Sequence, residues 1–167
     1  MNAVTLQFTY TEAEQVRAIR LYYDKNYNGK FDVLVCIVGI AFGLLLGTQL
    51  NDWQNAKYLF LLFGLLLTLI GYCYLVLPYK IYRNDPKVKE EYRLTFDDAG
   101  LHFQTKDIDS QIGWGLYNKV WRDRELIVLV HGKRTMTILP LRAFNSPADV
   151  EAMNSLLSRH IPARTKQ

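Results

Sequence analysis

Residues with reactive side chains are few in this chain, and their spacing matches no common catalytic motif. His102, His131 and His160 lie far apart, so a metal site would need a coincidence of tertiary structure. Asp97 and Asp98 could act as paired acids, but neighbouring strand residues face opposite ways and Asp-rich tetrads are common turns. The sequence contains no zinc-helix motif, phosphate loop, dinucleotide fingerprint or nucleophile elbow. We therefore expect neither an enzyme nor a cofactor.

Two long segments near the middle of the chain contain no charged residue and consist mostly of Leu, Phe, Ile, Val and Gly. A helix of about 20 apolar residues crosses a hydrocarbon core that is roughly 30 Å thick. We therefore expect a membrane hairpin over residues 31–80, with spans at about 33–50 and 58–77. The long polar segment before it argues against a cleaved signal peptide. Cys36 and Cys73 fall one in each span and are interpreted as small apolar residues.

Basic residues flank both outer ends of this hairpin, whereas the connecting loop NDWQNAK contains only Lys57. Because Lys and Arg accumulate on the cytoplasmic side, both termini are expected inside and the loop outside. The flanking basic residues are Arg17, Arg20, Lys25, Lys30, Lys80, Arg83, Lys87, Lys89 and Arg93.

Four of these basic residues, Lys80, Arg83, Lys87 and Lys89, directly follow the second span. Each could attract anionic lipid headgroups, with a contribution of about 1 kcal/mol near the surface. The same residues are also explained by the accumulation of Lys and Arg on the cytoplasmic side, without any lipid recognition. Nucleic-acid binding is disfavoured, since the basic residues cluster beside a span and no recognition module is visible.

Small residues recur along one face of the first span, at Gly39, Gly43 and Gly47. Glycine lets helix backbones approach closely, which favours helix association in lipid. Gly64 and Gly71 share a face of the second span and offer a complementary surface within the hairpin. The alternative is that the glycines pack against another membrane protein or a second copy of the chain.

The segment before the hairpin begins with a strand pattern, because apolar residues alternate with Thr and Gln from Val4 to Tyr10. Thr11 and Glu14 then form a capping-box pattern for a following helix. This helix either lies along the membrane surface or packs on the soluble domain. Residues 1–30 are expected to form part of the cytoplasmic domain.

Strand patterns dominate the segment after the hairpin. Two strands, Tyr92 to Phe96 and Leu101 to Thr105, flank the turn sequence DDAG. A final helix begins near Ser146 and ends before Pro162, where a polar tail over 162–167 follows. The remaining strands are expected at 110–114, 116–121, 126–131 and 135–139. Residues 81–161 with the first strand predict an α+β, mostly β, pleckstrin-homology-like partial barrel interrupted by the hairpin.

Three pieces occur in order along the chain: the opening FTYTEAE, the two-span hairpin, and a block with YRLTFDDAGL, SQIGW and ILPLRAFNSPADVEAM. In this order they resemble the YcxB-like family of bacterial membrane proteins. The resemblance implies a membrane protein with a pleckstrin-like domain and no established general activity. The residues that carry it in the block are Tyr92, Phe96, Gly100, Trp114, Pro140, Arg142 and Phe144.

These features together favour a non-enzymatic accessory or regulatory protein of the bacterial inner membrane, or of a comparable energy-transducing membrane. Its cytoplasmic domain is expected to bind a protein partner or to help assemble a membrane complex. Trp114, Trp121 and Phe144 are candidate anchors of the domain core or of an interface. Lys133, Arg134 and Arg142 are a weaker candidate patch for phosphate groups. The alternatives are a toxin-immunity protein and a scaffold that binds anionic lipid.

Overall fold

The computed structural model describes residues 3–132 and 135–161, and the chain divides into two compact units. The sheet unit comprises Met1–Ala18 together with Asp85–Gln167, and the hairpin unit comprises Ile19–Asn84. The sheet unit is thus interrupted in sequence by the hairpin unit, as the strand patterns predict.

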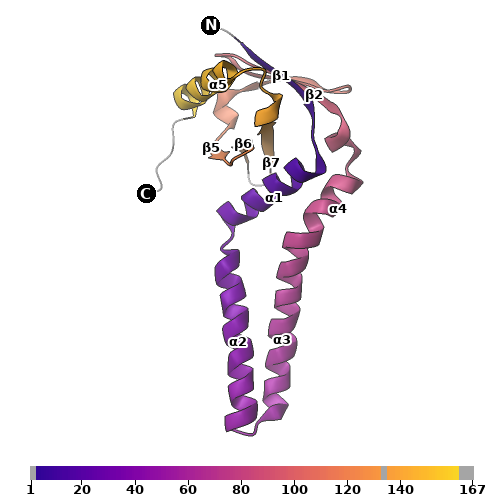
Figure 1. Cartoon of the computed structure of the whole chain (residues 1–167), viewed down its shortest axis with the longest axis vertical. Helices are drawn as coiled ribbons and strands as arrows, with labels where there is room; N and C mark the ends of the chain where they lie inside the picture. The colour runs from indigo at the N-terminus through magenta and orange to yellow at the C-terminus, as the bar shows by residue number, and fades with distance from the viewer. Residues whose placement is uncertain (1–2, 133–134, 162–167) are drawn as a thin grey trace. The chain divides into compact units, whose positions relative to one another are not determined.

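The sheet unit contains two antiparallel sheets and a C-terminal helix (Figure 1). The first sheet has the order β1 (Val4–Thr9), β2 (Glu91–Phe96), β3 (Gly100–Gln104), β4 (Asp109–Gly113). The second has the order β5 (Lys119–Arg122), β6 (Leu126–His131), β7 (Thr135–Pro140), and α5 (Pro147–His160) follows.

The first strand pairs with a strand that follows the hairpin, which confirms the expectation for Val4 to Tyr10. In the antiparallel register of β1 and β2, Val4 lies opposite Phe96 and Leu6 lies opposite Leu94. All four side chains are buried, since strict alternation places them on one face of the sheet. The core of the sheet unit therefore depends on residues that precede the hairpin in sequence and on residues that follow it.

A tight turn joins β2 to β3 at the predicted DDAG sequence. The Asp97 Oδ1 atom accepts hydrogen bonds from the backbone N–H groups of Ala99 and Gly100, at 2.8 and 2.9 Å. Gly100 has a φ of +152°, and a methyl group there would lie 2.2 Å from the Ile112 carbonyl oxygen on β4. The side chain of Asp97 thus serves the turn, and glycine is required for the close approach of β4.

The hairpin unit contains two helices that are long and apolar enough to cross a membrane. The first is α2 (Gly29–Gln49), and the second runs continuously over Trp53–Asn84. The second consists of α3 (Trp53–Gly71), a π-helical turn η1 (Tyr72–Val76) and α4 (Leu77–Asn84). Helix α2 begins before its expected span, and the second helix extends beyond its span at both ends, because polar residues continue the helical hydrogen bonding past the apolar segments.

Helix α1 (Glu12–Asn26) begins in the sheet unit and ends in the hairpin unit. Its start is the predicted capping box, in which the Glu14 N–H donates to Thr11 Oγ1 at 3.3 Å. In return, the Thr11 N–H donates to Glu14 Oε2 at 2.9 Å. The local sequence therefore fixes the first turn of α1 and directs the carboxylate of Glu14 back along the chain.

Candidate functional sites

An ion pair joins the start of α1 to the segment after β7. Arg142 Nε donates to Glu14 Oε1 at 2.6 Å, and Arg142 Nη2 donates to Glu14 Oε2 at 3.0 Å. Arg142 Nη2 also donates to the carbonyl oxygen of Thr9 at 2.8 Å. Only 10% of the Glu14 side chain is exposed, so this bidentate contact satisfies a nearly buried carboxylate. The guanidinium of Arg142, a member of the candidate phosphate patch, thus binds groups of the chain itself through Nε and Nη2.

The electrostatics of Glu14 reflect two opposed influences. Burial disfavours the charged carboxylate and is the largest single influence, but the hydrogen bonds from Arg142 and Thr11 together outweigh it. The net result is that the pKa of Glu14 is lowered from its ordinary value of 4.5. Glu14 is therefore a structural carboxylate that remains charged near neutral pH, unlike a general acid.

Two further contacts attach the first strand and helix to the second sheet. The buried phenol of Tyr10 donates to the carbonyl oxygen of Ile138 on β7 at 2.8 Å, and burial raises its pKa. Arg17 on α1 pairs with Asp123 and, at 2.6 Å, with Glu125 in the β5–β6 turn. These contacts lie on opposite sides of the capping box in sequence and hold the first turns of α1 on the sheet unit.

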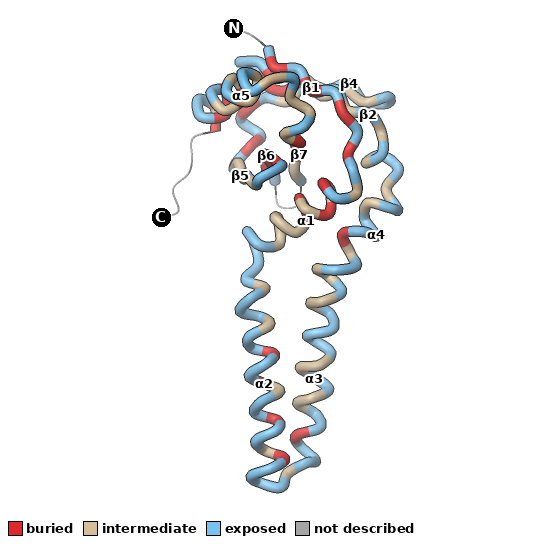
Figure 2. The backbone as a smooth tube through the Cα atoms, viewed as in Figure 1, coloured by how far each residue is buried: buried red, intermediate tan, exposed pale blue. Residues whose placement is uncertain are grey.

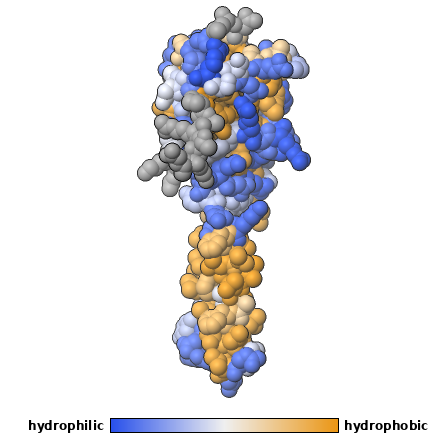
Figure 3. Space-filling view, turned by 90° about the vertical axis from the view of Figure 1, so that its left-hand side faces the viewer, coloured by the Kyte–Doolittle hydropathy of each residue, from blue (hydrophilic) through white to orange (hydrophobic). Residues whose placement is uncertain are grey.

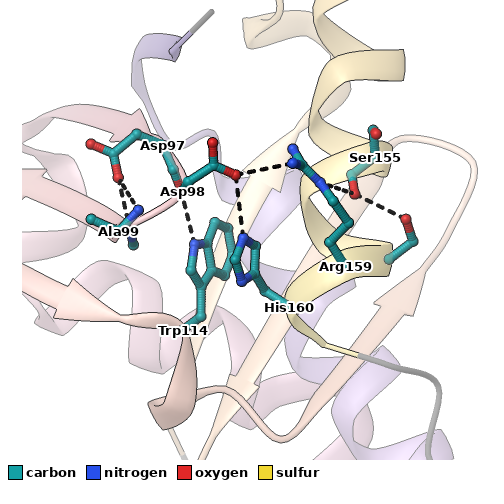
Figure 4. A network of polar contacts seen from close by, with 9 residues as sticks. Asp97, Asp98, Ala99, Trp114, Ser155, Arg159 and His160 are labelled. Carbon is teal, nitrogen blue, oxygen red and sulfur yellow. Dashed lines mark hydrogen bonds and ion pairs between the residues drawn. The ribbon is translucent and has the colours of Figure 1, made fainter. Parts of the chain in front are cut away.

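Trp114 lies at the centre of a polar and aromatic cluster between the β2–β3 turn and the end of α5 (Figure 4). Its ring stacks on His160 with a centroid separation of 5.2 Å, and its Nε1–H donates to the Asp97 carbonyl oxygen at 2.9 Å. Asp98 Oδ1 lies 3.2 Å from Arg159 Nη1 and 3.5 Å from His160 Nε2. Asp98 and Asp97 thus attach a turn to a helix end, and they do not converge as paired acids.

The other sequence candidates of the sheet unit occupy separate positions. Trp121 is half-buried on β5, and Phe144 is half-buried just before α5. His102 pairs with Asp109, its Nε2 atom lying 2.6 Å from Oδ1, whereas His160 belongs to the Trp114 cluster. Over residues 3–132 and 135–161, no group of three or more His, Cys, Asp or Glu side chains is arranged to hold a metal ion. Lys133 and Arg134 lie outside the described residues.

Buried positions recur along α2 within an otherwise mostly exposed helix (Figure 2). The three glycines of α2 are buried and lie against aromatic side chains of the second long helix. A methyl group on Gly39 would lie 2.2 Å from the ring of Phe63, and one on Gly47 would lie 2.7 Å from the ring of Trp53. The corresponding distance from Gly43 to Phe60 is 3.2 Å. The glycines therefore act as recesses for large side chains, a close packing within the hairpin.

Gly64 and Gly71 do not provide the complementary face expected from the sequence. A methyl group on either would meet no heavy atom within 4 Å. The physical reason is that bulky rings of α3 fill the recesses of α2, so the two helices meet ring against glycine and not glycine against glycine. Spacing alone could not identify which residues of α3 face α2.

A cluster around the π-helical turn joins the second half of α1 to the end of the long second helix. Pro78 has no N–H, so the carbonyl of Tyr74 loses its ordinary helical donor four residues later. Arg20 Nε donates to this carbonyl oxygen at 3.2 Å. The Tyr74 hydroxyl donates to Asp24 Oδ1 at 2.9 Å, and the Arg20 guanidinium lies 5.8 Å from the ring centroid of Tyr79.

The four basic residues expected at the membrane surface are all exposed. Lys80 and Arg83 lie on α4, and Lys87 and Lys89 lie in a 3₁₀ turn, η2 (Pro86–Lys89). The ammonium group of Lys80 lies 5.7 Å from the ring centroid of Tyr72, which orients the side chain along the helix. All four side chains therefore lie at the surface of the chain.

Comparison with protein families gives a match for part of the sheet unit. Residues 96–157 match the model of the YcxB-like protein family. This part of the chain is YcxB-like. The YcxB-like segment runs from the last residue of β2 into α5 and contains Trp114 and Arg142. Comparison with the curated proteins and with the solved structures gave no match.

Proposed function

We propose that this chain is a non-enzymatic integral membrane protein whose hairpin anchors a pleckstrin-homology-like domain at the cytoplasmic surface. The domain binds a protein partner, either another membrane protein or a second copy of the chain, and helps assemble a membrane complex. The observation that carries the proposal is the pairing of β1 with β2. Because β1 precedes the hairpin and β2 follows it, one folded domain is tethered at both ends of a two-helix anchor.

Membrane insertion is supported by the side chains on the outside of the two long helices. In the most apolar stretch of each helix, 22% and 0% of residues are buried inside the chain, whereas core helices of soluble proteins are mostly buried. Leu34 on α2 and Leu61 on α3, for example, are 54% and 69% exposed. The face drawn in Figure 3 is almost continuously apolar along the hairpin, which is the surface that hydrocarbon covers.

The pleckstrin-like assignment is supported by the topology of the sheet unit. The two antiparallel sheets of four and three strands, followed by a C-terminal helix, supply the strands and the final helix that the sequence patterns predict for such a domain. Fold alone does not identify a ligand, so the function is argued from exposed surfaces.

The outer face of the four-stranded sheet supports a polar protein partner. Gln7 Nε2 donates to Glu91 Oε1 at 2.9 Å, and Gln104 Nε2 donates to Asp109 Oδ2 at 2.9 Å. The face thus combines amides with charges of both signs, including Arg93, on a rigid sheet. Interfaces of this kind give specificity through matched hydrogen bonds and charges.

Co-purification of the tagged full chain in a mild detergent tests this proposal. Cross-linking before solubilisation, followed by mass spectrometry, should identify a protein bound to the wild type. Reversing the charge of exposed Arg93 should weaken that association, whereas reversing the charge of exposed Lys57, on α3 of the hairpin unit, should not. A wild-type chain that remains monomeric and partner-free after cross-linking in its native membrane would contradict the proposal.

A second candidate function, a scaffold for anionic lipid, is favoured by the exposed side chains of Lys80, Arg83, Lys87 and Lys89. Each basic residue near an anionic surface contributes about 1 kcal/mol. Replacing all four with Gln should then lower the affinity of the full chain for phosphatidylglycerol in nanodiscs. An unchanged affinity would exclude this candidate.

A further inference from the structure

A cavity of about 820 Å³ lies within the hairpin unit, where the end of α1, the start of α2 and the π-helical turn meet. Its lining divides into two chemical parts. Asp24, Asn28 and Lys30 supply charged and amide groups, whereas Val33, Ile70 and Leu75 supply aliphatic surface. A ligand that satisfies both parts must be amphipathic, with a charged end and a hydrocarbon end.

The charged part of the cavity contains one group of each sign. The carboxylate of Asp24 is held in place by the hydroxyl of Tyr74, which itself lines the cavity. A carboxylate has about four lone-pair sites, so Asp24 can accept further hydrogen bonds while it retains this one. Lys30 supplies three N–H donors of opposite charge on the first turn of α2. In the described part of the chain, neither side chain forms an ion pair with another residue.

The aliphatic part of the cavity belongs to the segments that we propose to cross the membrane. Val33 lies one turn after Lys30 on α2, and Ile70 lies one turn before Tyr74 on the second helix. An acyl chain running along Val33 and Ile70 would therefore continue into the bilayer. The polar headgroup of the same molecule would remain beside Asp24 and Lys30.

We propose that this cavity binds a phospholipid whose headgroup carries both a phosphate and a primary ammonium group, as in phosphatidylethanolamine. Lys30 binds the phosphate, and Asp24 accepts hydrogen bonds from the ammonium group. The carboxylate of Asp24 disfavours lipids with net negative charge, so this site differs in selectivity from the basic residues of α4. The inference rests on the membrane insertion in the proposed function.

Native mass spectrometry of the full chain, released from nanodiscs with equal amounts of phosphatidylethanolamine and phosphatidylglycerol, tests the site. The wild type should retain phosphatidylethanolamine preferentially. Asp24→Asn and Lys30→Gln should each reduce its retention about tenfold, as expected for one lost charge-assisted hydrogen bond. The control Lys57→Gln, at the opposite end of the hairpin, should leave retention unchanged.

The variant Asp24→Lys separates headgroup selection from damage to the fold. It adds a second positive charge, so the preference should move toward phosphatidylglycerol while total lipid retention persists. Equal retention of both lipids by the wild type, or an unchanged preference in Asp24→Lys, would overturn the lipid site alone. Failure of the wild type to assemble into nanodiscs would overturn the proposed function and the lipid site together.

Discussion

Arg142 donates hydrogen bonds to both carboxylate oxygens of Glu14, although 128 positions separate the two residues in sequence. The contact joins the motif FTYTEAE to the motif ILPLRAF across the whole hairpin insertion. Arg142→Ala should leave a nearly buried carboxylate without its cation and lower the free energy of unfolding by about 1–3 kcal/mol. Thermal unfolding of the full chain in detergent measures this loss. The exposed Arg122→Ala is the matched control, and equal midpoints for both variants would refute the role of the pair.

The same pair predicts how stability depends on pH. The pKa of Glu14 is lowered in the folded chain, so at mildly acid pH the unfolded chain binds a proton that the folded chain does not. The stabilisation that Glu14 contributes is therefore complete above the pKa that Glu14 has in the unfolded chain, near 4.5. This stabilisation is lost as pH falls through the lower pKa that Glu14 has in the folded chain. Glu14→Gln should reduce the loss of stability between about pH 5 and pH 3. If the free energy of unfolding falls equally in the wild type and in the variant over this pH interval, the predicted linkage is excluded.

Much of the sheet unit follows from local sequence signals. The alternation of Val4, Leu6 and Phe8 predicts β1, and Ser146 with Pro147 predicts the start of α5, where the Asp149 N–H donates to Ser146 Oγ at 3.2 Å. These features were predictable because each depends on residues that are close to one another in sequence. The start of β5 differs from expectation, at Lys119 and not residue 116, because a 3₁₀ turn intervenes.

The contacts that join distant segments were not predictable in the same way. Glu14 was visible as a capping residue, but nothing in its neighbourhood specified Arg142 as a partner. Gly64 and Gly71 share a helical face, yet rotation of α3 about its axis is set by where Phe63 and Trp53 fit. Proline at position 78 was a usable signal, since a missing N–H implies that a carbonyl needs another donor.

The glycine recesses of α2 predict a sharp difference between two substitutions. Gly39→Leu should force Phe63 aside and separate the helices, which costs about 1–3 kcal/mol by overpacking. Gly64→Leu introduces the same side chain where a methyl group meets no heavy atom within 4 Å, so it should have little effect. Thermal midpoints of the two purified variants test this difference. If the thermal midpoint of Gly39→Leu equals that of Gly64→Leu, the packing of aromatic rings against the α2 glycines does not stabilise the hairpin.

Arg20 is predicted to compensate for the missing N–H of Pro78. Arg20→Met should destabilise the full chain because the Tyr74 carbonyl oxygen loses the donor at 3.2 Å. Pro78→Ala restores a backbone donor, so Arg20→Met should cost less in that background, with a coupling energy of about 1 kcal/mol. A double-mutant cycle on thermal stability measures the coupling. Additive effects would mean that Arg20 does not act through this carbonyl.

The interrupted sheet unit should fold without its hairpin if both of its parts are supplied. A polypeptide that joins residues 3–18 to residues 85–161 through a flexible linker should be soluble and unfold cooperatively. Residues 85–161 alone should be poorly folded, because Leu94 and Phe96 lose the β1 strand that covers them. Circular dichroism during urea unfolding compares the two. Cooperative unfolding of the shorter polypeptide at equal stability would contradict the dependence on β1.

Cysteine accessibility in intact cells tests the proposed membrane topology most directly. In a chain with Cys36 and Cys73 replaced by alanine, single cysteines are placed at Gln54 in the first turn of α3 and at Ser158 on α5. An impermeant maleimide should label the cysteine at position 54 in intact cells and the one at position 158 only after lysis. Labelling of position 158 in intact cells, with position 54 protected until lysis, would contradict the proposed topology.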